Sequence, residues 1–169
     1  MVMGSGAQMK PEWVRATVGT IVTNLQSLEF AVRLFLSQSV GPADPNLHID
    51  RLKTGDTVAE GHLTNYDSPR EVIRKANDRL AELGTPERLD ESLVEIRDAF
   101  AHGRVFALQP DGPYRLVKFD RPKDGTVEVV AMLELTRERL KLEVERSGNE
   151  VLKVVSVGRR LGLACFPED

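Results

Sequence analysis

The chain has 169 residues, of which 41% are hydrophobic and 29% are charged, as is typical of a globular domain. Its formal net charge of −3 excludes a protein that binds nucleic acid through a generally basic surface, so such binding would need a local basic patch. The single cysteine, Cys165, excludes an internal disulfide and a cysteine-rich metal cluster, and it fits a reducing cytoplasm.

The first residues, MVMGSGAQMK, lack the basic start and the apolar run of a signal peptide. No stretch of the sequence is apolar over a membrane-spanning length. We therefore expect a single cytoplasmic domain over residues 1–169, with residues 1–10 disordered and no association with a membrane.

The first predicted helix runs from Glu12 to Gln38. Apolar residues recur along it at alternating spacings of four and three, as on the buried side of a helix in a bundle. These residues are Val14, Val18, Ile21, Leu25, Leu28, Val32 and Phe35. Phe30, Leu34 and Leu36 widen the apolar stripe, which favours a bundle core over an isolated coiled coil.

A long irregular loop is expected over residues 41–67, which are rich in Gly, Pro, Asp and Thr and show no sustained period. A second helix follows. Ser68, Pro69 and Glu71 have the spacing of a capping box with proline in the first turn, and Gly84 predicts the end of the helix.

A third helix is predicted to begin at once, with Thr85 as its cap and Pro86 in its first turn, and to end at Gly103. The apolar positions of this segment have helical spacing and are expected to be buried. They are Leu89, Leu93, Ile96 and Phe100.

After Gly103 the apolar period changes to two, which predicts a small antiparallel hairpin or meander of two or three strands over residues 104–135. From Thr136 the helical period returns. Its seam is Leu140, Val144, Val151, Val154 and Leu161, and the small residues Ser147 and Gly158 on that seam predict close approach of a neighbour. The fold class that follows is mainly α, a four-to-five-helix bundle with a small antiparallel β insertion before the last helix.

The stretch EIRDAFAHGRV, from Glu95 to Val105, places two arginines and a histidine at the end of the third predicted helix. Asp98 and His102 are four residues apart, so their side chains lie on one side of the helix. Arg97 and His102 border a shared polar edge, because five residues turn a helix by about 140° at about 100° per residue. A guanidinium can bind phosphate oxygens and an imidazole can transfer a proton, so the stretch is suited to phosphodiester chemistry without a metal. The alternative is an ordinary helix whose basic end complements its dipole.

This stretch resembles the R-x4-6-H motif of the HEPN superfamily, in which the arginine is commonly followed by Asn, Asp or His. RDAFAH, from Arg97 to His102, fits that pattern, and the ending AHG is typical of members. The resemblance implies a single helical-bundle domain, and an endoribonuclease that needs no cofactor and acts as a homodimer with both motifs in one cleft. Arg97, Asp98 and His102 would be the catalytic residues, and we assign Arg104 to phosphate binding.

The same resemblance implies an RNA substrate, attack by the 2′-hydroxyl on its own phosphate, and a role as a toxin or defence protein with an antitoxin or defence partner. Some relatives instead bind RNA, a nucleotide or a protein without catalysis, and this remains the alternative. A homodimer with a two-fold axis is also favoured on physical grounds. One copy supplies only one arginine and one histidine of the motif for phosphoryl transfer, and a second copy doubles them.

Two other features have simpler interpretations. His48 and His62 lie among aspartates in the irregular loop, but their spacing matches no metal-ligand pattern, so no metal site is expected. Glu29 and Arg33 have the spacing of an ion pair on the first helix, and Glu29 could also reach Arg97.

Overall fold

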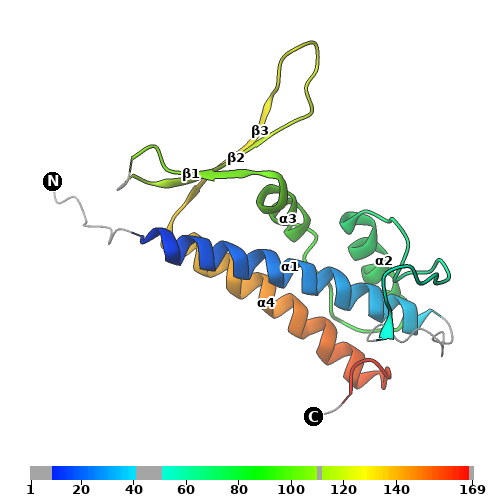
Figure 1. Cartoon of the computed structure of the whole chain (residues 1–169). Coiled ribbons are helices and arrows are strands. Elements are labelled where there is room, and N and C mark those ends of the chain that lie inside the picture. The colour runs from blue at the N-terminus through cyan, green and yellow to red at the C-terminus, as the bar shows by residue number, and fades with distance from the viewer. Residues whose placement is uncertain (1–8, 41–50, 110–111, 168–169) are drawn as a thin grey trace. The chain divides into compact units, whose positions relative to one another are not determined.

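The structure is a computed structural model that describes residues 9–40, 51–109 and 112–167. The expected disordered segment, residues 1–10, therefore lies almost wholly outside the described residues, as does the first part of the expected loop at 41–67. The described residues form four helices and three strands (Figure 1). They are α1 (Pro11–Ser39), α2 (Pro69–Glu82), α3 (Leu93–His102), β1 (Arg104–Phe106), β2 (Tyr114–Phe119), β3 (Val129–Leu135) and α4 (Arg137–Arg160). The predicted fold class is confirmed.

The chain divides into two compact units, and α1 and α4 each contribute to both. The sheet unit comprises Met1–Asn24 and Ser92–Ser147, and the helical unit comprises Leu25–Glu91 and Gly148–Asp169. In the described part of the chain, no helix combines the length and apolar character that crossing a membrane requires.

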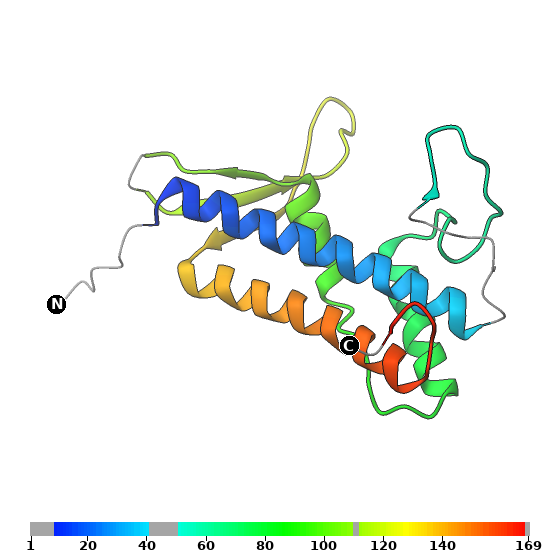
Figure 2. The same cartoon turned by 60° about the horizontal axis from the view of Figure 1, so that its bottom comes forward.

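In the sheet unit, the first halves of α1 and α4 run side by side in the same direction (Figures 1 and 2). At one end the Arg137 guanidinium lies 4.6 Å from the ring centre of Trp13. At the other end the Asn24 amide donates to Ser147 Oγ at 3.2 Å. Ser147 is fully buried, so its small side chain permits the close approach that the sequence predicted.

The three strands form an antiparallel meander in the order β1-β2-β3. Because side chains alternate along a strand, the sheet has two different faces. The inner face packs on α3 and buries Leu116 completely, beside Val105 and Leu133, with which Leu116 is in register. The outer face carries Arg104, Phe106, Arg115, Val117, Phe119, Met132 and Glu134. Figure 1 shows β2 and β3 continuing into a projecting hairpin.

In the helical unit, α2 begins and ends as its sequence predicts. The Ser68 side chain accepts a hydrogen bond from the Glu71 backbone, and the Glu71 carboxylate accepts one from the Ser68 backbone at 2.8 Å. Gly84 has a φ of +69°, which lets the Thr85 amide reach back to the Leu80 carbonyl and close the helix.

Arg33 organises the described part of the expected loop. Its guanidinium pairs with Glu29 at 3.1 Å, as predicted, and it donates to the Asn65 side chain at 2.8 Å and to the Asp67 carbonyl at 2.8 Å. It also donates to the His62 carbonyl at 3.2 Å. One guanidinium on α1, 11% exposed, thus holds residues 62–67, which form neither helix nor strand.

The prediction of a third helix beginning at Pro86 is wrong, because α3 begins at Leu93. The preceding segment has other partners for its backbone. Leu89 is bracketed by the Asn77 side chain, which accepts from its amide at 2.7 Å and donates to its carbonyl at 3.1 Å. The amide of Asp90 donates to the Glu150 carboxylate at 3.1 Å. The Asn77 and Glu150 side chains thus hydrogen-bond to backbone groups that a helix here would have used for its own hydrogen bonds.

Two expectations about buried side chains also need correction. Phe30 is 46% exposed, so it does not widen the buried stripe of α1. On α4, two positions of the predicted apolar seam, Val144 and Val151, are only half-buried. The residues just before them, Glu143 and Glu150, are buried instead. Each buried glutamate has a basic partner one turn later, Arg146 for Glu143 and Lys153 for Glu150. A carboxylate that is paired can occupy a position that the sequence pattern reserves for apolar residues.

Candidate functional site

The site lies in the sheet unit, where α3 ends and β1 begins. Gly103 forms the junction, and its amide donates to the Ala99 carbonyl at 2.7 Å. A side chain at this position would overlap the Ala99 oxygen and would lie 2.8 Å from Leu116 Cδ2 on the inner face of the sheet. The helix therefore ends after His102, as predicted, and glycine is needed there because the last turn of α3 approaches β2 closely.

Asp98 is the centre of a small polar cluster. One carboxylate oxygen lies 3.6 Å from Nε2 of His102, one turn further along α3. The other oxygen accepts a hydrogen bond from the ammonium group of Lys118, which comes from β2. The side chain of His102 is 61% exposed and that of Asp98 is 38% exposed. The imidazole is thus held beside a carboxylate while remaining open to a ligand from solvent.

Lys118 was not among the residues predicted for the site. Its position in the sequence carried a signal, however, because it follows Tyr114 and Leu116 at a spacing of two and so belongs to the inner face of β2. A lysine on a buried face needs a carboxylate partner. The sequence did not indicate which carboxylate would pair with Lys118, because Asp98 is twenty positions away, on the preceding helix.

The two predicted arginines occupy different places. Arg97 is half-buried on α3, about 140° around the helix from His102 at about 100° per residue. Arg104 is exposed on the outer face of the sheet, and its guanidinium lies 5.1 Å from the ring centre of Phe119. Lys118 lies on the inner face, so the cluster around Asp98 and the guanidinium of Arg104 are on opposite faces of β1 and β2.

The cluster combines three side-chain groups. The Asp98 carboxylate and the His102 imidazole are one turn apart on α3, and the Lys118 ammonium group comes from β2. Without Lys118, the Asp98 carboxylate beside His102 would repel a phosphodiester, and its ion pair with the ammonium offsets that repulsion. An exposed imidazole can accept or donate a proton, and neighbouring cations can stabilise charge on phosphate oxygens. The arrangement therefore suits proton transfer beside a bound anion.

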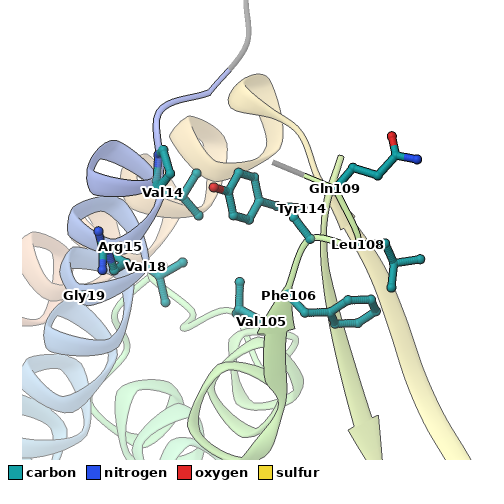
Figure 3. A pocket seen from close by; sticks show the side chains of 11 residues that line it. Val14, Arg15, Val18, Gly19, Val105, Phe106, Leu108, Gln109 and Tyr114 are labelled. Atoms are coloured by element: carbon teal, nitrogen blue, oxygen red, sulfur yellow. The ribbon is translucent and has the colours of Figure 1, made fainter. Parts of the chain in front are cut away.

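A groove of about 850 Å³ lies in the same unit, between the first half of α1 and β1 (Figure 3). In the figure Val14 and Val18 of α1 face Val105 and Tyr114 across it. Its lining is mainly apolar, and among the described residues that line it Arg15 is the one charged side chain. The described lining contains Tyr114 but no His, Asp, Glu, Cys or Lys, and none of the predicted site residues.

No group of three or more His, Cys, Asp or Glu side chains is placed to hold a metal ion in the part of the chain that the structure describes. His48, considered as a ligand with His62, lies outside the described residues. The backbone carbonyl of His62 accepts a hydrogen bond from the Arg33 guanidinium.

A scan against models of known protein families, a search of curated proteins and a search of solved structures each found no match to this chain.

Proposed function

We propose that this chain is an endoribonuclease of the HEPN type that cleaves RNA without a metal ion, at a site composed of two copies of the chain. The observation that carries the proposal is the exposed imidazole of His102, held beside Asp98 with Lys118 on the other carboxylate oxygen. Arg97, Asp98 and His102 lie on α3, and Lys118 reaches Asp98 from β2.

In the proposed reaction, the 2′-hydroxyl of a ribose attacks the adjacent phosphorus. The bond between the 2′-oxygen and phosphorus forms, and the bond between phosphorus and the 5′-oxygen of the next nucleotide breaks. An imidazole takes the proton of the 2′-hydroxyl, and a protonated imidazole gives one to the leaving 5′-oxygen. The products are a 2′,3′-cyclic phosphate and a 5′-hydroxyl end.

The need for both a proton acceptor and a proton donor supports a dimer. One chain supplies one His102, whereas two chains related by a two-fold axis supply two imidazoles to one cleft. Arg97, Lys118 and Asp98 together carry one formal positive charge per chain, so two chains bring two such charges to the cleft on a protein whose net charge is negative. The cationic side chains then stabilise the charge that develops on the phosphate oxygens.

Cleavage of RNA in the presence of EDTA tests the proposal. The wild-type protein should cleave, and His102→Ala should lower the rate roughly 100- to 10,000-fold, the usual contribution of an acid–base group. His62→Ala is the matched control and should cleave at the wild-type rate. Activity that disappears with EDTA, or that survives His102→Ala, would contradict the proposal.

Crosslinking tests the composite site. Ala101 is exposed and adjacent to His102, so Ala101→Cys in a Cys165→Ser background places one thiol beside the motif. A short bismaleimide should then join two chains efficiently. Leu152→Cys on α4, at a side chain that is 66% exposed, is the control and should give little covalent dimer. Equal crosslinking at both positions would argue against a shared cleft.

A second candidate function is a module that binds RNA, a nucleotide or a protein partner without cleaving it. The position of Arg104 on the outer face, stacked on Phe119 and away from His102, favours this alternative. It predicts salt-sensitive binding that is lost in Arg97→Ala, with no turnover by the wild-type protein.

A further inference from the structure

The outer face of the sheet carries exposed basic side chains and half-buried aromatic side chains around Val117, which is itself buried. In register across the strands, Arg104, Val117 and Met132 form one row, and Phe106, Arg115 and Glu134 form the next. Met132 is 56% exposed, and Arg104 and Arg115 are exposed. Half-buried Phe119 lies diagonal to Arg104, beneath its guanidinium.

From these side chains we infer that the outer face binds single-stranded RNA, with bases stacked on the aromatic rings and phosphates paired with the guanidinium groups. This inference rests on the proposed function for its substrate, and it adds a second surface to that function. It assigns Arg104 to the path of the RNA rather than to the phosphate that is cleaved.

The chemistry of the face fits a single strand. Phe106 and Phe119 offer flat apolar rings on a sheet, and the bases of a single strand are free to stack on such rings. A duplex keeps its bases stacked inside, so it could use only the two arginines. The Arg104 guanidinium lies over this ring at cation–π distance, so a base that stacks on the same side of the ring would displace it toward a phosphate.

The charge on the face argues against a second copy of the chain as its occupant. Arg104 and Arg115 lie on the first two strands, and Glu134 on the third is the carboxylate that faces Arg115 across the strands. A two-fold pairing of this face with itself would bring four guanidinium groups and two carboxylates together, leaving an excess of like charge. An RNA strand neutralises that excess with its phosphates.

The face is also continuous with the motif. Arg104 is the first residue of β1, and only Gly103 separates it from His102. Because the cluster around Asp98 lies on the opposite face of the sheet, an RNA strand on the outer face would have to pass around the start of β1 to reach His102. The face would hold the flanking nucleotides while the motif acts on one phosphate.

Fluorescence anisotropy with a labelled RNA of about twelve nucleotides tests the inference. The RNA carries 2′-O-methyl groups, so it cannot cleave itself during the measurement. Wild-type protein should bind the single strand more tightly than the same strand annealed to its complement. Phe119→Leu, which keeps apolar bulk but removes the ring, should weaken binding about tenfold, and Phe119→Tyr should restore it. Phe30→Leu, at an exposed phenylalanine outside the sheet, is the matched control and should bind as wild type.

The salt dependence of RNA binding tests the role of the arginines. Arg115→Ala should weaken binding and lower the slope of log affinity against log salt by about 0.7, the value for one phosphate contact with a single strand. Arg15→Ala, at an arginine of α1 whose side chain is 76% exposed, should leave the slope unchanged. Circular dichroism of each variant checks that the fold is intact.

Equal affinity for single strand and duplex, or wild-type affinity in Phe119→Leu and Arg115→Ala, would overturn the inference. So would a change of oligomeric state in Arg115→Glu, because the face would then be covered by a second copy. The results also distinguish the binding face from the proposed nuclease activity. If His102→Ala loses cleavage but binds RNA as wild type does, both proposals are supported. If the wild-type protein binds RNA through this face but never cleaves it, only the nuclease proposal is refuted.

Discussion

Replacing Gly103 by alanine tests how the end of α3 is held against the sheet. The added methyl group would overlap the Ala99 carbonyl oxygen and lie 2.8 Å from Leu116 Cδ2. The carbonyl belongs to the backbone and Leu116 is fully buried, so neither can move without disturbing its neighbours. Overpacking of this kind costs about 1–3 kcal/mol.

A loss of that size should lower the melting temperature by roughly 2–12 °C in a domain of this length. Circular dichroism during thermal unfolding measures it. Gly19→Ala is the matched control, because a methyl group there meets no atom within 4 Å and Gly19 lies within α1. In that helical position alanine should stabilise the protein by up to about 1 kcal/mol. If Gly103→Ala melts at or above the wild-type temperature, the close approach of α3 to β2 is wrong.

The remaining predictions concern the ion pairs. Arg33→Met should destabilise the protein by about 3 kcal/mol in urea unfolding and speed amide exchange in residues 62–67, whereas Arg15→Met should change stability by less than about 0.5 kcal/mol. A hydrogen bond from Lys75 lowers the pKa of Asp67 below its usual value of 3.8, so the stability that this carboxylate contributes is complete above the unfolded pKa and is lost as the pH falls through the folded pKa. Asp67→Asn and Lys75→Met should therefore both flatten the acid side of the melting temperature against pH, and an unchanged acid side would contradict this. Lys118→Met should weaken RNA binding and kcat/KM roughly tenfold, equivalent to about 1.4 kcal/mol, because the Asp98 carboxylate loses its cation, and Lys118→Arg should retain most of both.

Local signals in the sequence predicted much of the fold. The alternating spacing of apolar residues predicted α1, and the capping box of Ser68 and Glu71 predicted the start of α2. The change of period after Gly103 predicted the meander. Each of these depends on residues within a few positions of one another, so the information is present in a short window of sequence.

The errors arose where distant side chains decide local structure. The start of α3 depends on Asn77 and Glu150, which capture the backbone of the preceding segment. Those side chains come from α2 and α4, far from Pro86 in the sequence, so the residues around Pro86 alone had the pattern of an ordinary helix start. Buried Glu143 was missed for a similar reason, since its burial depends on pairing with Arg146.

The candidate site was predictable in part. The spacing of Asp98 and His102 predicted that they share a side of the helix, and their 3.6 Å separation agrees with that. The partner Lys118 and the stacking of Arg104 on Phe119 depend on how the strands pair in register. One residue of slip would move each side chain to the other face, so the sequence pattern alone did not predict them.

The chemistry of the RNA ends tests the central claim most directly. A single-stranded RNA should be digested in EDTA by wild type and His102→Ala, and the ends of the products identified by mass spectrometry. We expect 2′,3′-cyclic phosphate and 5′-hydroxyl ends from the wild-type protein, and intact RNA both from His102→Ala and from a substrate with 2′-O-methyl groups throughout. Cleavage of the methylated substrate, or products with 5′-phosphate ends, would contradict attack by the 2′-hydroxyl beside His102.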